Sequence, residues 1–234
     1  MILQLLITIS FFRIFVKSIE LTSLEYSYIV IEGNIGAGKT SLASRLSLEM
    51  NTALILEQFE ENSFLPKFYE DPSRYAFPLE LSFLADRYQQ LKNHFTRPEL
   101  FTSRTIADYF IFKSLIFARQ NLEPAEFSLY NRLFQIISSI IPKPDLVVYL
   151  FLEPQGLKEN IIKRGRSYEQ NISLEYLGKI QQGYLDFLKQ QKDFRIVLIN
   201  TSGLDFVGQE EDYSKIKVLM EREWLPGMHV IERQ

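Results

Sequence analysis

Cysteine is absent from the 234 residues of this sequence, which excludes disulfide bonds, thiolate metal sites and a cysteine nucleophile. Histidine is scarce: His94 and His229 stand alone, outside any metal-ligand spacing, so packed or solvated roles are expected for both. The net charge is −3 and no basic tract is present, so the sequence lacks the electrostatic signature of nucleic-acid binding. We therefore expect no nucleic-acid partner, and the lack of cysteine is compatible with the cytoplasmic location that we predict.

Residues 1–16 are apolar but do not resemble a targeting signal. No positive charge precedes the apolar run, Arg13 lies inside it, and no small-residue cleavage site follows it. The run is also shorter than the roughly 20 residues that cross a bilayer. We predict that residues 1–25 are an extension outside the fold, that residues 26–234 form one domain, and that no membrane is involved. A peripheral amphipathic anchor in residues 1–16 is the alternative.

A phosphate-binding loop is the strongest local signal that the sequence does contain. The apolar run Tyr28–Glu32 predicts a strand, and the spacing of Leu42 and Leu46 predicts a helix directly after the loop. The glycines let successive N–H groups turn inward, and the helix directs its unpaired N–H groups to the same point. Lys39 supplies a charge for the outer phosphates, and the Thr40 hydroxyl is the candidate Mg²⁺ ligand. The predicted nucleotide-binding loop consists of Gly33, Asn34, Ile35, Gly36, Ala37, Gly38, Lys39 and Thr40.

Apolar runs and helical periodicity alternate along the rest of the chain. Further strands are predicted at Ala53–Leu56, Leu146–Leu152 and Arg195–Ile199. Helices are predicted at 62–71, 74–95, 105–119, 127–141, 154–163 and 174–192, with a last, charged helical segment near the C-terminus. Strands that alternate with helices predict an α/β fold, a parallel β-sheet covered by helices, of the phosphate-loop nucleoside triphosphate hydrolase type.

Charged side chains stand at the end of a predicted strand and on one face of a predicted helix, and both positions are candidates for a functional site. Glu57 follows the second strand, where active sites of α/β sheets gather, although a solvated acidic loop is the alternative interpretation. Glu80 and Arg87 are seven residues apart on one helix face. No Asn-Lys-x-Asp signature for guanine is present, and Glu153 before Pro154 is explained by helix capping. The remaining class, small-molecule kinases, needs an acceptor pocket, a base and an arginine-bearing lid.

Four motifs in order resemble the deoxynucleoside kinases, with bacterial deoxyadenosine and deoxyguanosine kinases closest in look. The resemblance extends from about Tyr28 to Phe206. Its motifs are the loop 31–40, the strand-end Glu57, the stretch 68–77, and the stretch 164–177 that begins Arg-Gly-Arg-Ser-Tyr-Glu-Gln. The resemblance implies transfer of the ATP γ-phosphoryl group, with Mg²⁺, to the 5′-hydroxyl of a deoxynucleoside in nucleotide salvage, by a homodimer.

The resemblance also implies a role for individual residues. Glu57 corresponds to the general base, Tyr69 and Glu169 to the pair that binds the sugar 3′-hydroxyl, and Arg164 and Arg166 to lid arginines. Glu80 stands where a base-reading glutamine is usual. Arg87, Asp108 and Phe112 correspond to residues that contact the nucleobase, and Asp205 and Phe206 to the loop that touches adenine. Structural roles are the alternatives: a packed Tyr69, an Arg87–Asp108 ion pair, and a solvated helix end at Arg164 and Arg166.

Two positions depart from the family pattern. An acidic-Arg-Ser triplet is expected before the aspartate at 108, but residues 102–105 lack the acid, which leaves Arg104 as the candidate to steady Glu57. In the lid, Asn160 stands where a third arginine is common, and Lys163 is the candidate replacement.

Two other functions remain open alternatives. A nucleoside monophosphate kinase related to thymidylate kinase would need more arginines than Arg74 in the acceptor region. A non-catalytic ATP-binding module would leave Glu57 idle. The expected nucleobase is a purine. An ionised Glu80 only accepts hydrogen bonds, and thymine offers it N3–H between two carbonyl oxygens that would repel the carboxylate.

Overall fold

The structure is a computed structural model that describes residues 26–58, 62–96 and 104–232. The expectations for an extension at residues 1–25, and for residues 102 and 103 of the missing triplet, lie outside the described residues. In the described ranges, no helix is both long enough and apolar enough to cross a membrane.

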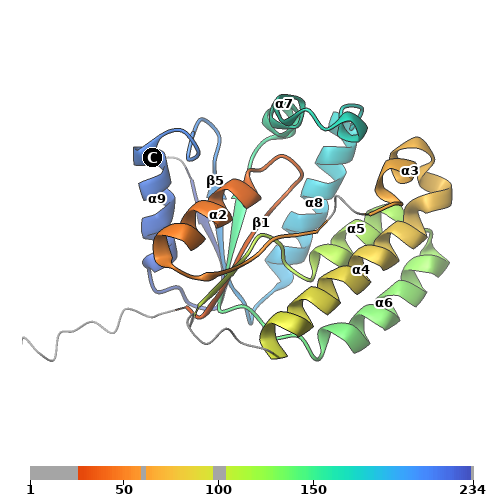
Figure 1. Cartoon of the computed structure of the whole chain (residues 1–234), viewed down its shortest axis with the longest axis horizontal. Coiled ribbons are helices and arrows are strands. Elements are labelled where there is room, and N and C mark those ends of the chain that lie inside the picture. Colours follow the sequence, from red (N-terminus) through yellow and green to blue (C-terminus); the bar gives the residue numbers. More distant parts are fainter. Residues whose placement is uncertain (1–25, 59–61, 97–103, 233–234) are drawn as a thin grey trace, which may run out of the picture.

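The centre of the molecule is a six-stranded sheet in which every strand pairs parallel to its neighbours (Figure 1). The spatial order is β2-β3-β1-β4-β5-β6. This order confirms the predicted α/β class with a parallel sheet. The strands are β1 Tyr28–Gly33, β2 Ala53–Ile55, β3 Thr105–Ala107, β4 Leu146–Phe151, β5 Arg195–Asn200 and β6 Gly227–Ile231.

Helices connect the strands and cover both faces of the sheet, as a parallel sheet requires. Apart from residues 105–119, each predicted helix has an observed counterpart, with ends that differ by a few residues. The break expected at Pro72 is confirmed, since one helix ends at Glu70 and the next begins at Pro72. The helices are α2 Lys39–Met50, α3 Leu65–Glu70, α4 Pro72–Thr96, α5 Lys113–Asn121, α6 Pro124–Ser138, α7 Pro154–Arg164, the 3₁₀ turn η1 Ser167–Glu169, α8 Leu174–Gln190 and α9 Glu210–Glu221.

The helix predicted over residues 105–119 is wrong in its first half. Thr105–Ala107 is strand β3, which pairs with β1 on one side and β2 on the other, and the helix α5 begins only at Lys113. Three residues are too few to show an alternating pattern, so the pairing decides their conformation. The edge strand β6 was also missed, because its residues are half-exposed and form no apolar run.

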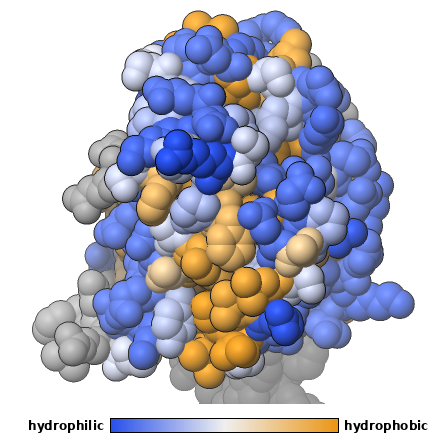
Figure 2. Space-filling view, turned by 90° about the vertical axis from the view of Figure 1, so that its right-hand side faces the viewer, coloured by the Kyte–Doolittle hydropathy of each residue, from blue (hydrophilic) through white to orange (hydrophobic). Residues whose placement is uncertain are grey.

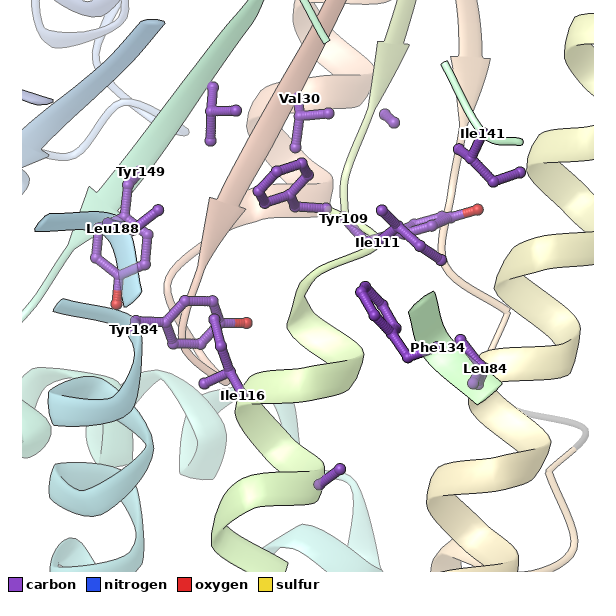
Figure 3. Close-up of a cluster of buried hydrophobic side chains, with 14 of the residues drawn as sticks. Val30, Leu84, Tyr109, Ile111, Ile116, Phe134, Ile141, Tyr149, Tyr184 and Leu188 are labelled. Atoms are coloured by element: carbon purple, nitrogen blue, oxygen red, sulfur yellow. The ribbon is translucent and has the colours of Figure 1, made fainter. Parts of the chain in front are cut away.

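Successive residues of each strand point to opposite faces, which divides the interior into two cores. Tyr28 and Val30 of β1 pack toward α4, α5, α6 and α8, whereas Ile29 and Ile31 pack toward α2, α7 and α9. In the first core, Tyr109, Phe134, Tyr149 and Tyr184 are fully buried; Figure 3 shows them between the sheet and the helices. The sheet is thus held rigidly between its two helix layers.

The strand order determines where functional groups meet. Ile55 of β2 and Val30 of β1 are both in register with Ala107 of β3, so β2 and β3 end side by side, while β1 continues three residues further at the same edge, to Gly33. The segments that follow these ends contain the phosphate loop, Glu57 and Asp108, respectively. In open α/β sheets this edge is the place for a ligand.

Candidate active site

The phosphate loop lines a large cavity. Gly36 and Gly38 have φ of 84° and 85°, which favours glycine, and a Cβ on Gly38 would lie 2.7 Å from Cζ of Phe206. Behind the loop, helix α2 begins at Lys39, whose Nζ donates to the carbonyl oxygen of Asn34 at 3.0 Å. The cavity has a volume of about 1140 Å³ and is the size of a nucleotide site.

The predicted nucleotide-binding residues divide between three places. Gly36 to Thr40, Arg164, Arg166, Asp205 and Phe206 all line the large cavity. Ile35 lines a second, smaller cavity instead. Gly33 and Asn34 are buried beneath the loop, where the Asn34 amide donates to the carbonyl of Leu177 at 2.8 Å. These two residues therefore shape the loop from below and line neither cavity.

The end of helix α7 and the residues up to Arg166, here called the lid segment, form one side of the large cavity. Helix α7 ends at Arg164, and Gly165, with φ of 78°, turns the chain so that Arg164 and Arg166 both pair with Glu169. Lys163 also lines this cavity. The Asn160 amide donates to the carbonyl of Gly36 at 2.9 Å, so the residue that replaces an expected arginine ties the lid helix to the phosphate loop.

The smaller cavity, of about 100 Å³, opens from the same junction. Six residues line both cavities, and they are the point where the two spaces meet: Lys39, Thr40, Glu57, Asp108, Arg164 and Arg166. Tyr69, Glu80, Arg87 and Glu169, all predicted to bind substrate, line the smaller cavity as well. The arrangement can bring a phosphate donor in one cavity against a hydroxyl acceptor in the other.

Two cations hold Glu57 at this junction. Nε and Nη2 of Arg87 both donate to Oε1, at 2.9 and 2.6 Å, and Nζ of Lys113 donates to Oε2 at 2.6 Å. Burial opposes the negative charge, but Lys113 and Arg87 more than offset it and hold the pKa of Glu57 well below its usual range. Glu57 is therefore ionised at neutral pH, and the solvated acidic loop is excluded as an explanation.

Asp108 lies next to the phosphate loop, where the two cavities meet. Its Oδ2 accepts a hydrogen bond from Oγ1 of Thr40 at 2.6 Å, and its Oδ1 accepts from the backbone N–H of Glu57, also at 2.6 Å. Arg87 pairs with Glu57, and not with Asp108 as the alternative interpretation of an Arg87–Asp108 ion pair held. The reason is the strand β3, which carries Asp108 to the carboxyl edge of the sheet.

Phe112 packs among other aromatic side chains. Its ring packs among Phe110, Phe134, Phe187 and Phe194 at centroid distances of 4.9 to 5.7 Å and lines neither cavity, so this structure does not place Phe112 for the predicted base contact. Phe117 lines the smaller cavity instead. Phe112 precedes α5, whereas Phe117 lies inside it, on the helix face that borders the smaller cavity.

Arg104 is not placed to steady Glu57. It immediately precedes β3, whereas Glu57 lies beyond the end of β2, and the two strands are parallel. The two residues are therefore at opposite edges of the sheet. Lys113 and Arg87 form the ion pairs with Glu57 that were expected of Arg104.

Glu80 is a buried carboxyl group in the wall of the smaller cavity. Its side chain is 2% exposed, Oε1 accepts from Nδ2 of Asn121 at 2.7 Å, and Oε2 has no partner in the described part of the chain. Burial raises the pKa of Glu80 to about 7, although the Asn121 hydrogen bond and the charge of Arg87 act in the opposite direction. Glu80 thus changes between acid and carboxylate near neutral pH.

Tyr69 and Glu169 come from different elements but face the same cavity. Tyr69 is on α3 and Glu169 ends the turn η1, where it is 5% exposed and neutralised by Arg164 and Arg166. Burial raises the pKa of the Tyr69 hydroxyl well above its usual value, with Tyr176 and Glu169 adding to the effect. The hydroxyl therefore stays protonated and can donate.

Several wall residues escaped the sequence analysis. Lys113, Phe117, Asn121 and Tyr176 line the smaller cavity, and the Tyr176 hydroxyl donates to Oδ1 of Asn121 at 3.2 Å. Lys113, Phe117 and Asn121 are four residues apart on α5, so they share one helix face. A shared face by itself does not indicate a function, and the sequence carried no other signal for these residues. Glu153 precedes α7, but its side chain makes no capping hydrogen bond, and it lines the large cavity.

The sequence was compared with known families and proteins. The model of the family described as "Deoxynucleoside kinase" matches residues 29–224. A deoxyguanosine kinase of Bacillus subtilis is 34% identical over 196 residues, which cover 81% of this chain and 93% of the relative. A deoxyadenosine kinase of Dictyostelium discoideum is 33% identical over 201 residues, with 86% and 82% covered.

Solved structures resemble the fold as well. The structure of deoxyadenosine kinase from M. mycoides with bound dATP superposes with a TM-score of 0.70 at 25% identity, covering 82% of this chain and 97% of the other. The same enzyme with bound dCTP gives a TM-score of 0.71 at 25% identity, with 82% and 98% covered. The overall architecture is thus the phosphate-loop nucleoside triphosphate hydrolase fold of these kinases.

Proposed function

This chain belongs to the deoxynucleoside kinase family and phosphorylates deoxynucleosides, and from that premise we propose that it transfers the γ-phosphoryl group of ATP to the 5′-hydroxyl of a purine deoxynucleoside in nucleotide salvage. One observation supports the proposal above others: a nucleotide-sized cavity and a smaller polar cavity share Lys39, Glu57 and the lid arginines. Donor phosphate and acceptor hydroxyl meet at that junction.

Donor binding uses the loop and the lid. The N–H groups of the loop and the start of α2 receive the phosphates, and Lys39 and the arginines 164 and 166 neutralise them. Phe206, which packs on Gly38, and Asp205 line the part of the cavity left for adenine. Lid closure excludes water, which would otherwise hydrolyse ATP.

The residues near Thr40 suit Mg²⁺. The Thr40 hydroxyl and the Asp108 carboxylate, 2.6 Å apart, are hard oxygen donors at the edge of the large cavity. Protein sites for Mg²⁺ with nucleotides use one or two such groups and leave the other positions to water and phosphate. When bound there, the ion would neutralise charge on the phosphate oxygens.

Glu57 accepts the proton of the 5′-hydroxyl. Its low pKa makes it a weak base, but phosphoryl transfer has a loose transition state in which the attacking oxygen loses its proton late. A carboxylate that is always ionised and held by two cations orients the hydroxyl reliably. Its main contribution is therefore position, with proton acceptance at the end of the step.

Sugar recognition is proposed for Tyr69 and Glu169. The two side chains line the smaller cavity on the side of the lid, and Glu169 also binds both lid arginines. A 3′-hydroxyl bound there would connect substrate binding to lid position. An acceptor without that hydroxyl would leave buried polar groups unpaired, which costs affinity.

Base preference is proposed for Glu80 with Asn121. The amide of Asn121 binds Oε1, whereas Oε2 has no partner in the described residues and is the oxygen that we propose for the base. As a carboxylate, Glu80 accepts from the N1–H and N2 amino group of guanine or from the N6 amino group of adenine. As an acid, it donates through Oε2 to adenine N1. Thymine suits the carboxylate poorly because carbonyl oxygens flank its N3–H.

We further propose a cytoplasmic homodimer whose kinase domain is residues 26–234, with residues 1–25 as an extension. An apolar patch on the side of α4 and α6 supports the dimer (Figure 2). Its members on α6 and just beyond it are Leu129, Ile136 and Ile140, with exposures of 42%, 68% and 64%. Leu129 and Ile136 are seven residues apart and therefore lie on one face of α6. An exposed apolar face of this kind is typical of an interface.

The decisive experiment is an ADP-release assay with ATP and Mg²⁺, run with each of the four deoxynucleosides and, in separate reactions, with their monophosphates. ADP release that requires a deoxynucleoside and is faster with purines supports the proposal. Release that requires a monophosphate would indicate a nucleoside monophosphate kinase. Product analysis by chromatography distinguishes the 5′-monophosphate from other esters.

A further inference from the structure

We propose that Lys113 is a positioning residue of the phosphoryl transfer, which acts by holding Oε2 of Glu57 beside the acceptor hydroxyl. The inference rests on the role proposed above for Glu57. Lys113 is 7% exposed, opens helix α5 and lines the smaller cavity. No feature of the sequence had indicated a function for it.

The hydrogen bonds on Glu57 show which of its oxygens receives the substrate. A carboxylate has about four acceptor sites, two on each oxygen. Arg87 fills both sites of Oε1, with Nε at 2.9 Å and Nη2 at 2.6 Å, and Lys113 fills one site of Oε2 at 2.6 Å. The acceptor hydroxyl is left with the second site of Oε2, next to the ammonium group of Lys113.

The backbone around Lys113 is built to keep this ammonium group in place. Tyr109, Phe110 and Ile111, which precede α5, are at most 5% exposed, and Figure 3 shows Tyr109 and Ile111 within the core. The N–H of Phe110 donates to Oε2 of the buried Glu32 at 2.7 Å, and the N–H of Lys113 donates to the carbonyl of Phe110 at 2.8 Å. The first turn of α5 is thus fixed to the end of β1.

The charges are consistent with a role in the reaction. Arg87 alone neutralises Glu57, and Lys113 adds a second positive charge to the pair. Burial lowers the pKa of Lys39, and the nearby charge of Lys113 lowers it further. Two buried ammonium groups near one another are unfavourable in the free protein. The repulsion is relieved when a phosphate enters between them, so the site is complementary to the transferring group.

The test compares Lys113→Met with Lys113→Arg in steady-state kinetics. In the methionine variant we expect kcat to fall about 100-fold, as for a misplaced reacting group, while KM for ATP and for the deoxynucleoside changes less than about threefold. The arginine variant should recover kcat to within about tenfold of the original protein. Lys179→Met, which removes an exposed partner of Glu175 on α8, is the matched control and should change neither constant.

A double variant separates positioning from a structural effect. Because Lys113 acts through Glu57, Lys113→Met combined with Glu57→Gln should be no slower than Glu57→Gln alone, whereas independent defects would multiply. A Lys113→Met enzyme with kcat within threefold of the original, or multiplied losses in the double variant, would overturn the inference. If the methionine variant does not fold by circular dichroism, Lys113→Gln is judged by the same criteria. If Glu57→Gln itself keeps full activity, the proposed role of Glu57 fails first.

Discussion

The hydroxyl of Thr40 donates a hydrogen bond to Oδ2 of Asp108 at 2.6 Å, joining the start of α2 to the end of β3. The two residues are 68 positions apart in the chain, and their contact puts a carboxylate next to the phosphate loop. The backbone N–H of Glu57 binds the other oxygen of the same carboxylate. Asp108 therefore connects the phosphate loop to the segment that carries Glu57.

Asp108→Asn should weaken the use of Mg²⁺, because the amide keeps the shape but loses the charge that attracts the ion. We expect the Mg²⁺ concentration for half-maximal rate to rise at least about tenfold, with a lower kcat. An Mg²⁺ titration at fixed ATP measures both. Asp186→Asn, on the exposed side of α8, is the control. An unchanged Mg²⁺ requirement would exclude Asp108 as a ligand.

Glu57→Gln should lower kcat by about 10²–10⁴-fold, since the proton acceptor and the charge that pairs with Arg87 and Lys113 are both lost. ATP binding, measured by titration calorimetry, should survive because Glu57 lies at the junction and not among the loop N–H groups. Turnover near that of the original protein would show that Glu57 is not the base.

Removing the 3′-hydroxyl from the substrate should reveal the sugar contacts. A 2′,3′-dideoxynucleoside should have a kcat/KM at least about tenfold lower than its deoxy counterpart, because the hydrogen bonds proposed between the 3′-hydroxyl and Tyr69 and Glu169 would be lost. Tyr69→Phe should reduce this discrimination, whereas Tyr88→Phe, outside both cavities, should leave it intact. Equal efficiency for both substrates would make the two residues structural.

The choice of base should depend on pH through Glu80. Its pKa of about 7 means that the acid form predominates below pH 7 and the carboxylate above it. Adenine N1 needs a donor, whereas the N1–H and N2 amino group of guanine need an acceptor. The ratio of kcat/KM for deoxyguanosine to that for deoxyadenosine should therefore rise by several-fold between pH 6 and 8.

Two controls accompany this measurement. Glu80→Gln does not titrate and should give a ratio that is constant with pH. At pH 8 thymidine should have the lowest kcat/KM of the four deoxynucleosides, and Glu80→Gln should raise it relative to the purines. A ratio that is flat in the original protein, or thymidine as the best substrate, would contradict the role of Glu80.

The apolar patch on α6 predicts a dimer that a single charge disrupts. Ile136→Glu should shift the sedimentation coefficient from dimer to monomer, because a carboxylate buried in an apolar interface costs several kcal/mol. Val218→Glu, at an exposed apolar position on α9, is the matched control. A monomeric original protein at micromolar concentration would contradict the dimer.

The sequence alone determined the phosphate loop, because its conformation depends on neighbouring glycines between a strand and a helix. It also determined the place of Glu57 and of the Glu80–Arg87 face, since strand ends and helix periodicity are local properties. The lid arginines and Glu169 are likewise neighbours in the chain, and their pairing needed only the turn at Gly165.

Only the tertiary structure decided the roles of Asp108, Phe112 and Lys113. Thr105–Ala107 becomes a strand because β1 and β2 pair with it on both sides, which no local pattern indicates. That strand moves Asp108 to the phosphate end and sets the phase of α5, so that Phe112 packs in the core while Lys113 reaches Glu57, 56 residues earlier in the chain. Contacts over such separations depend on the strand order of the sheet, and that order follows from the packing of the whole domain.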